Sequence, residues 1–137
     1  MRVGELMTLD PQTVSPGDTL QSAAQRMDDL NVGVLPVCEG DRLLGVLTDR
    51  DIVVRSTSAG QDPRTATVAD AMTTDAHTVT EDAAVLDVIR IMEERQLRRV
   101  PVVNEAGKLV GIVSLGDLAA AGTPEAGDAL EAISGSE

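Results

Sequence analysis

Apolar residues recur along the chain with two different spacings, and each spacing predicts a different kind of element. From Leu20 to Met27 they stand at positions i, i+3, i+4 and i+7, which is typical of one buried face of a helix. Two β-branched runs follow, GVLPV and RLLGVLT, and predict strands joined by a glycine-containing turn. A second helix is expected to begin directly afterwards, at Asp49. With a short strand at Thr13 and Val14, this part of the chain predicts the order β-α-β-β-α.

The same order occurs a second time. A shift of 65 residues places Pro36 on Pro101, and after a one-residue insertion in a turn a shift of 66 places Asp51 on Asp117. The helical spacing returns from Val85 to Met92. A repeat of roughly 60 residues has a thin core by itself, so the two copies are expected to pack together. We therefore expect an α/β protein, more narrowly α+β, in which tandem β-α-β-β-α repeats form one module with pseudo-twofold symmetry.

The repeat also predicts how the chain is divided. We expect repeat one at residues 1–58, a polar connector at 59–67, and repeat two at 68–122. The remaining residues, 123–137, carry four acidic side chains and no basic one. We expect this acidic tail to be flexible and to contribute solubility rather than chemistry.

Charge narrows the range of partners. The chain of 137 residues has 23 acidic and 11 basic side chains, a formal net charge of −12. Nucleic acids and anionic membranes both attract basic surfaces, so this charge argues against binding to either. We find no run of about 18 apolar residues that could cross a membrane, and the first residues lack the apolar core of a signal peptide. We expect a cytoplasmic protein.

The chain also lacks the usual components of an active site. It has no Phe, Tyr or Trp, and its single histidine, His77, lies in a polar connecting stretch. A Ser–His–Asp triad would have to use that one residue. The single cysteine, Cys38, can form neither an intrachain disulfide nor a cysteine-based zinc site, and we expect it to be buried as a small apolar side chain. We expect no enzymatic activity, no required cofactor and no metal site.

Two related stretches carry the candidate chemistry: GVLTDRD at 45–51 and GIVSLGD at 111–117. In each, a strand ends in Thr or Ser, and a carboxylate follows three residues later as a helix begins. One interpretation is a capping box that satisfies the free N–H groups at the start of the helix. The other is a ligand site, in which Thr48 and Arg50 bind a phosphate and the two oxygens of Asp51 accept from a ribose diol.

The ordered set TV, PV and GhhT/SxxD, in which h is apolar, occurs twice over about residues 1–120 and resembles the CBS domain pair, named after cystathionine β-synthase. The stretch LTDRDIVVRSTSAGQDPRTAT is similar to small stand-alone bacterial CBS-pair proteins, including hypoxic- and stress-response members. The resemblance implies a disc-like (Bateman) module with adenosyl ligands in clefts between the repeats. It also implies pairing into dimers.

The resemblance further implies two ligand sites. In the first, Asp51 would bind the ribose diol, and Thr48 and Arg50 the phosphate. The base pocket of the first site would be lined by Thr13, Val14, Val34, Leu35 and Pro36. The second site would use Thr78, Val79, Arg99, Pro101, Ser114 and Asp117. Arg99 is similar to family arginines that reach a phosphate, whereas Val34 stands where the family has a basic residue and Gly116 stands at the position of Arg50.

We therefore expect a non-enzymatic sensor that binds AMP, ADP, an ATP-like nucleotide or S-adenosylmethionine between its repeats and forms a homodimer. With no aromatic side chain, an adenine would be held between aliphatic side chains and backbone polar groups. The alternative is a ligand-free CBS scaffold that acts through dimerisation and an unidentified protein partner.

Overall fold

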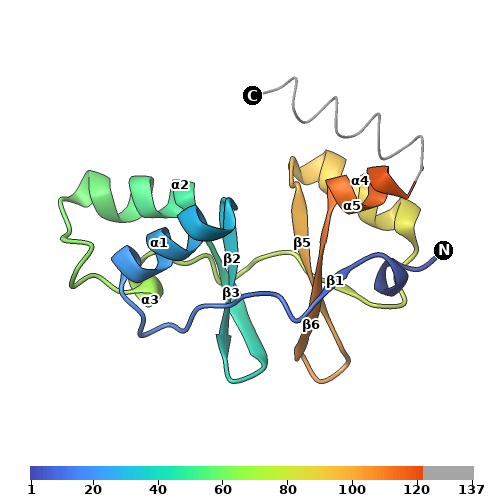
Figure 1. Cartoon of the computed structure of the whole chain (residues 1–137), viewed down its shortest axis with the longest axis horizontal. Coiled ribbons are helices and arrows are strands. Elements are labelled where there is room, and N and C mark those ends of the chain that lie inside the picture. Colours follow the sequence, from blue (N-terminus) through green and yellow to red (C-terminus); the bar gives the residue numbers. More distant parts are fainter. Residues whose placement is uncertain (122–137) are drawn as a thin grey trace. The chain divides into compact units, whose positions relative to one another are not determined.

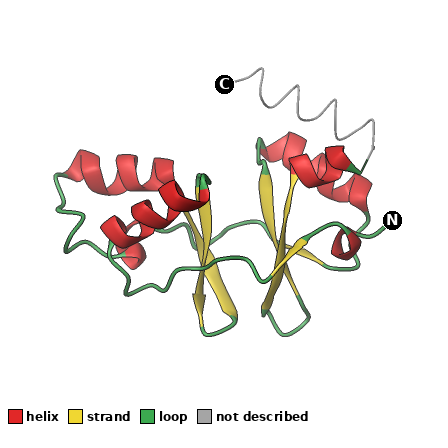
Figure 2. Cartoon of the chain, viewed as in Figure 1, coloured by secondary structure: helices red, strands yellow, loops and turns green. Residues whose placement is uncertain are grey.

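The computed structural model describes residues 1–121, so the predicted acidic tail at 123–137 lies outside the described residues. The described chain forms two compact units. The continuous unit is Gln12–Ala76, and the split unit combines Met1–Pro11 with the chain from His77 onward. Each unit thus contains most of one sequence repeat together with the segment that opens the other repeat. We call these opening segments, residues 1–11 in the split unit and residues 68–76 in the continuous unit, the exchanged segments. Figures 1 and 2 show the elements of both units.

The continuous unit contains two long helical stretches and an antiparallel strand pair. Its elements are α1 (Leu20–Leu30), β2 (Val34–Glu39), β3 (Arg42–Thr48), α2 (Asp49–Asp51) and α3 (Val68–Ala71). After α2 the chain continues through a π-helical turn at Ile52–Ser56 and a 3-10 turn at Thr57–Ala59. The β2–β3 pair is extended on both sides by single bridges, Val14 parallel to Val37 and Val46 antiparallel to Thr73.

The split unit has the same arrangement, with the flanking segments long enough to be strands. Its elements are a 3-10 turn (Val3–Glu5), β1 (Thr8–Leu9), β4 (Val79–Thr80), α4 (Val85–Arg95), β5 (Arg99–Val103), β6 (Leu109–Ser114) and α5 (Leu115–Ala120). The sheet order is β1-β6-β5-β4, with β4 parallel to β5 and the other pairs antiparallel. Helices α2 and α5 begin at the residues that follow the two predicted strand ends.

Each unit has its own hydrophobic core. Leu20, Ala23 and Met27 on α1 fill the continuous unit as their helical spacing predicts. The exchanged segments also contribute to these cores, because Val68 in the continuous unit and Val3 in the split unit are both fully buried. None of the helices in the described part of the chain is long and apolar enough to cross a membrane.

Glycines make room for the exchanged segments. Val46 and Thr73 exchange two backbone hydrogen bonds, with N···O distances of 2.9 and 2.8 Å. A Cβ atom at Gly45 would lie only 2.2 Å from the carbonyl oxygen of Thr73. The corresponding Gly111 faces Thr8 and the side chain of Met7 at 2.6–2.9 Å in the same way. A side chain at either glycine is therefore incompatible with this pairing.

We predict that Gly45→Ala lowers the free energy of unfolding by about 1–3 kcal/mol, because Thr73 must move away and lose its pairing with Val46. Gly17→Ala is a matched control, since a Cβ there meets nothing within 4 Å. The control should change stability by less than about 1 kcal/mol, and in the stabilising direction. Urea denaturation of both variants measures the difference, and equal midpoints would contradict the steric argument.

Candidate functional site

The predicted ligand carboxylate of the continuous unit, Asp51, lies in a capping box. The Thr48 hydroxyl accepts a hydrogen bond from the backbone N–H of Asp51 at 2.9 Å, and Asp51 Oδ2 accepts from the N–H of Thr48 at 3.0 Å. The capping interpretation is therefore correct at the level of local structure. It leaves chemistry available, because the Thr48 hydroxyl uses a lone pair here and keeps its hydrogen for donation.

Two further side chains hold Asp51, and neither was predicted from the sequence. The Thr73 hydroxyl lies 3.3 Å from Oδ1 and 3.2 Å from Oδ2 and donates its hydrogen between them. Arg55 forms an ion pair with Asp51, with Nε 3.9 Å from Oδ1. The Asp51 side chain is only 12% exposed as a result. The signal that could have revealed Thr73 was Gly45, since an isolated glycine inside a strand indicates close approach of another backbone.

Arg55 also binds the segment that carries Thr73. Its Nη1 donates to the carbonyl oxygens of Met72 at 2.8 Å and Ala71 at 3.3 Å. One guanidinium therefore links the start of the helix to the exchanged segment.

The split unit repeats the capping box without these additions. The Ser114 hydroxyl accepts from the N–H of Asp117 at 2.9 Å, and Asp117 Oδ2 accepts from the N–H of Ser114 at 3.1 Å. Within the described residues, Asp117 has no other side-chain hydrogen bond or ion pair. Thr8, which corresponds to Thr73, is exposed. The two carboxylates thus differ in how firmly they are held.

The other predicted residues of the continuous unit fall into three pairs. Val34 is the cross-strand partner of Thr48, so it adjoins the capping box, and Arg50 is exposed on the first helical turn. Val14 and Leu35 are nearly fully buried and belong to the hydrophobic core. Of the remaining two, Pro36 is buried and Thr13 is half-buried. The carbonyl oxygen of Thr13 accepts a hydrogen bond from Arg26.

The split unit places its predicted residues in a similar way. Arg99 is the cross-strand partner of Ser114, so this half-buried arginine lies beside the second capping box. Pro101 is buried further along the same strand, Val79 belongs to the core, and Thr78 is half-buried. Each unit therefore brings a hydroxyl and a carboxylate together, and the arginines lie on different elements.

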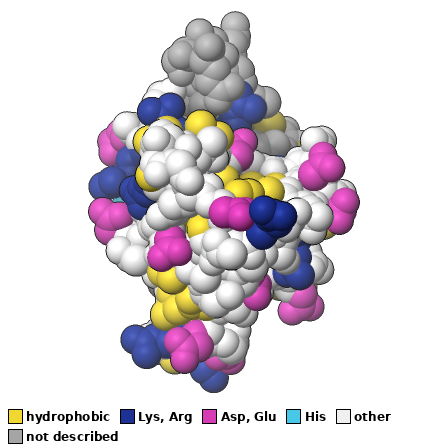
Figure 3. Space-filling model, turned by 90° about the vertical axis from the view of Figure 1, so that its left-hand side faces the viewer, with side chains coloured by type: hydrophobic (Ala, Val, Ile, Leu, Met, Phe, Trp, Pro, Cys, Tyr) yellow, Lys and Arg dark blue, Asp and Glu magenta, His cyan; other side chains and the backbone are white. Residues whose placement is uncertain are grey.

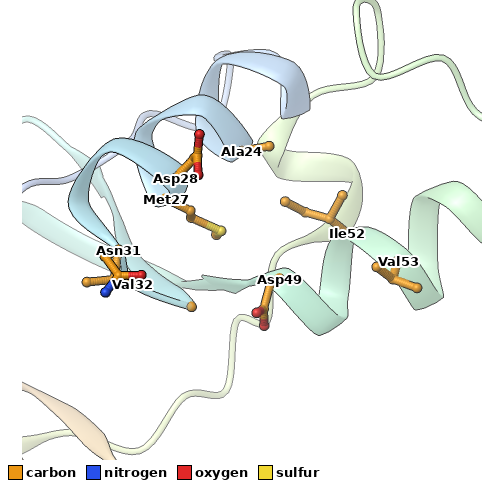
Figure 4. A pocket seen from close by; sticks show the side chains of 9 residues that line it. Ala24, Met27, Asp28, Asn31, Val32, Asp49, Ile52 and Val53 are labelled. Carbon is orange, nitrogen blue, oxygen red and sulfur yellow. The ribbon is translucent and has the colours of Figure 1, made fainter.

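A hollow of about 530 Å³ lies on the continuous unit between α1 and the helical stretch that begins with α2. In Figure 4, Met27 and Ile52 point toward each other across it, with Asp28 and Asp49 at its margins. None of the predicted ligand residues lines this hollow. Its open, largely apolar walls differ from the polar surroundings of Asp51.

The sequence model of the CBS-domain family matches the chain twice, at residues 3–57 and 68–123. The chain belongs to the CBS-domain family. It is a CBS-domain pair, a regulatory module of mixed α/β structure, as the repeat predicts.

CBS-pair relatives match most of the chain. Hypoxic response protein 1 of Mycobacterium tuberculosis is 42% identical over 116 residues, which covers 84% of this chain and 80% of the relative. The CBS domain-containing protein YhcV of Bacillus subtilis is 42% identical over 134 residues, which covers 96% of this chain and 94% of the relative. Inosine-5′-monophosphate dehydrogenase of Methanocaldococcus jannaschii is 32% identical, but the match spans only 23% of that enzyme.

Two solved CBS-domain structures are informative about ligands. The crystal structure of Hypoxic Response Protein I with two coordinated zinc ions has a TM-score of 0.79, 40% identity, and coverage of 88% of this chain and 98% of the other. CBSX2 in complex with AMP also has a TM-score of 0.79, with 28% identity and coverage of 88% and 95%. Within residues 1–121 of the present CBS pair, no three His, Cys, Asp or Glu side chains are grouped to hold a metal.

Cys38 is buried on β2, as its position after the PV run predicts. Burial raises the pKa of its thiol, and the negative charge of Asp41 raises it further. The reactive thiolate is therefore scarcer at neutral pH than in an ordinary cysteine.

We predict that native Cys38 reacts with a disulfide reagent such as DTNB at least roughly tenfold more slowly than glutathione at pH 8. Urea should remove the difference, because unfolding exposes the thiol and returns its pKa to the ordinary range. A native rate equal to the unfolded rate would contradict the burial of this side chain.

Proposed function

We propose that this CBS pair is a sensor that binds an adenosine nucleotide, with the dominant site at Thr48, Arg50 and Asp51. The observation that supports this most directly is the AMP complex of CBSX2, a structure with the same fold over most of both chains. The duplicated hydroxyl–carboxylate pair of the present chain supplies groups that can bind a phosphate and a ribose.

Each member of the site has a distinct role in this proposal. Asp51 accepts from the 2′ and 3′ hydroxyls of the ribose through its two oxygens. The Thr48 hydroxyl donates its free hydrogen to the phosphate, and the exposed guanidinium of Arg50 adds a charge-assisted bond. The adenine is held between aliphatic side chains and read by backbone polar groups, since the chain has no aromatic residue.

The net charge of −12 influences which nucleotide is favoured. A strongly acidic protein repels a highly charged anion, and the repulsion rises with the number of phosphate charges. AMP, or ATP neutralised by magnesium, should therefore bind more easily than free ATP.

The two units are unequal in this proposal. The continuous unit carries hydroxyl, guanidinium and carboxylate within four residues, whereas the split unit has Gly116 at the position of Arg50. Its phosphate contact must come from Arg99 on β5. Arg50 stands two residues from Thr48 on the same turn, so we expect its charge-assisted hydrogen bond, worth about 1.5–3 kcal/mol, to make the first site the tighter one.

We predict one dominant AMP site per chain in titration calorimetry. Asp51→Asn should weaken it by at least about tenfold, because the amide keeps one acceptor for the cap and loses the charge and the second acceptor. Asp117→Asn is the matched control and should leave the dominant site unchanged.

Urea denaturation of both variants separates the loss of capping, about 0.5–2 kcal/mol, from the loss of binding. Equal AMP affinity in Asp51→Asn and the parent would mean that Thr48 and Asp51 cap the helix and do not bind the nucleotide. An absence of binding by AMP, ADP, ATP and S-adenosylmethionine at millimolar concentration would favour the ligand-free scaffold.

We also propose that the chain forms a homodimer through the helical surface of the continuous unit. Leu30, Val53 and Val54 are 42–58% exposed on its two helical stretches, and Val53 lines the hollow between them. Figure 3 shows exposed apolar side chains lying between acidic and basic ones. A second copy of the chain would cover such a surface through a closed twofold interface, which is the commonest form of assembly.

We predict that light scattering gives about twice the chain mass of 14.3 kDa at micromolar concentration. Val53→Asp should yield the monomer, because a charge would be buried in the interface. Leu9→Asp, a change at a 65%-exposed leucine on β1, should leave the dimer intact. A monomeric parent would refute the assembly.

A further inference from the structure

Asp51 and Asp117 occupy equivalent positions, yet within the described residues only Asp51 is held by side chains from outside its own helical turn. Thr73 donates to both carboxylate oxygens at 3.2–3.3 Å, and Arg55 pairs with Oδ1 at 3.9 Å. Both contacts depend on the exchanged segment, because it carries Thr73 and its carbonyl groups hold Arg55.

We propose that Thr73 and Arg55 are positioning residues that hold the Asp51 carboxylate in one orientation and thereby give the continuous unit its preference for a vicinal diol. The inference rests on the proposed function and deepens it, because it assigns the specificity of that site. Neither residue needs to contact the ligand.

The rotational freedom of the carboxylate affects how well it binds a diol. A diol makes two hydrogen bonds to one carboxylate only when both oxygens lie in the right plane, so a rotating carboxylate loses entropy on binding. The bond from Thr48 N–H holds Oδ2 alone. Thr73 spans both oxygens, and its position is fixed by its backbone bonds to Val46. Together these contacts define the plane.

Enough acceptor capacity remains for a ligand. A carboxylate offers about four lone-pair sites. The Thr48 N–H takes one, the single Thr73 hydrogen is shared between the oxygens, and Arg55 at 3.9 Å lies outside hydrogen-bond distance. Two hydroxyl groups can therefore bind if the shared hydrogen shifts to one oxygen.

The split unit provides the internal comparison. Thr8 stands where the continuous unit has Thr73, but its hydroxyl makes no hydrogen bond to Asp117 in the described residues. The position of Arg55 corresponds to Ala121, which has no guanidinium. Among residues 1–121, Ser114 alone holds the Asp117 side chain. The proposal therefore assigns weaker diol selectivity to this unit.

The test compares AMP with 2′-deoxy-AMP, which lacks one hydroxyl of the diol. The parent should bind AMP at least about tenfold more tightly than the deoxy form, the equivalent of one hydrogen bond to a charged group. Thr73→Val keeps the β-branched shape and removes the hydroxyl, so it should lower this preference to about threefold or less. Thr73→Ser restores the hydroxyl and should restore the preference.

Two further variants complete the experiment. Arg55→Gln should lower the preference in the same direction as Thr73→Val. Thr8→Val makes the same chemical change at the equivalent position and should leave the preference unchanged. A purely structural role for Thr73 would lower stability in urea while the ratio of the two dissociation constants stayed at the parent value.

The possible failures are distinguishable. A parent that prefers AMP, together with a Thr73→Val variant of equal preference, overturns the positioning role and leaves the proposed nucleotide site standing. A parent that binds neither nucleotide overturns the proposed function, and this inference with it. A Thr73→Ser variant that behaves like Thr73→Val also overturns the positioning role.

Discussion

The pairing of Thr73 with Val46 is the contact on which the continuous unit depends. It attaches a segment from the far end of the unit to β3, and it exists because Gly45 has no side chain to separate the two backbones. The same pairing aligns Val68 with the core and brings the Thr73 hydroxyl to Asp51. Sheet extension, core filling and the surroundings of the candidate carboxylate therefore share one physical origin.

The capping boxes show how one geometry can serve both stability and chemistry. A capping hydroxyl accepts from the backbone and retains its own hydrogen, and a capping carboxylate uses one oxygen and retains the other. Local folding thus holds both groups at the surface in a defined orientation. Asp51 has contacts with Thr73 and Arg55 in addition to its cap, whereas the Asp117 side chain has the cap alone within the described residues.

Local patterns were sufficient to predict much of this structure. The helix from Leu20 and the strand-to-helix junction at Asp49 depend on patterns within short stretches of the sequence. Both predictions are confirmed. The repeat is confirmed by the match to two CBS domains. The two-residue strand at Thr8–Leu9 carries no comparable signal, because so short a run does not specify its partner. The contacts of Asp51 with Thr73 and Arg55 follow from tertiary pairing, which the sequence pattern does not show.

The exchange of opening segments has a consequence for synthesis on the ribosome. Residues 12–76 include every element of the continuous unit, so that unit can close while the rest of the chain is still being made. Residues 1–11 precede that unit in the chain but belong to a core whose last strand, β6, ends at Ser114. Loop closure over about a hundred residues costs entropy and delays folding, so residues 1–11 reach their native place after the unit that follows them in the chain.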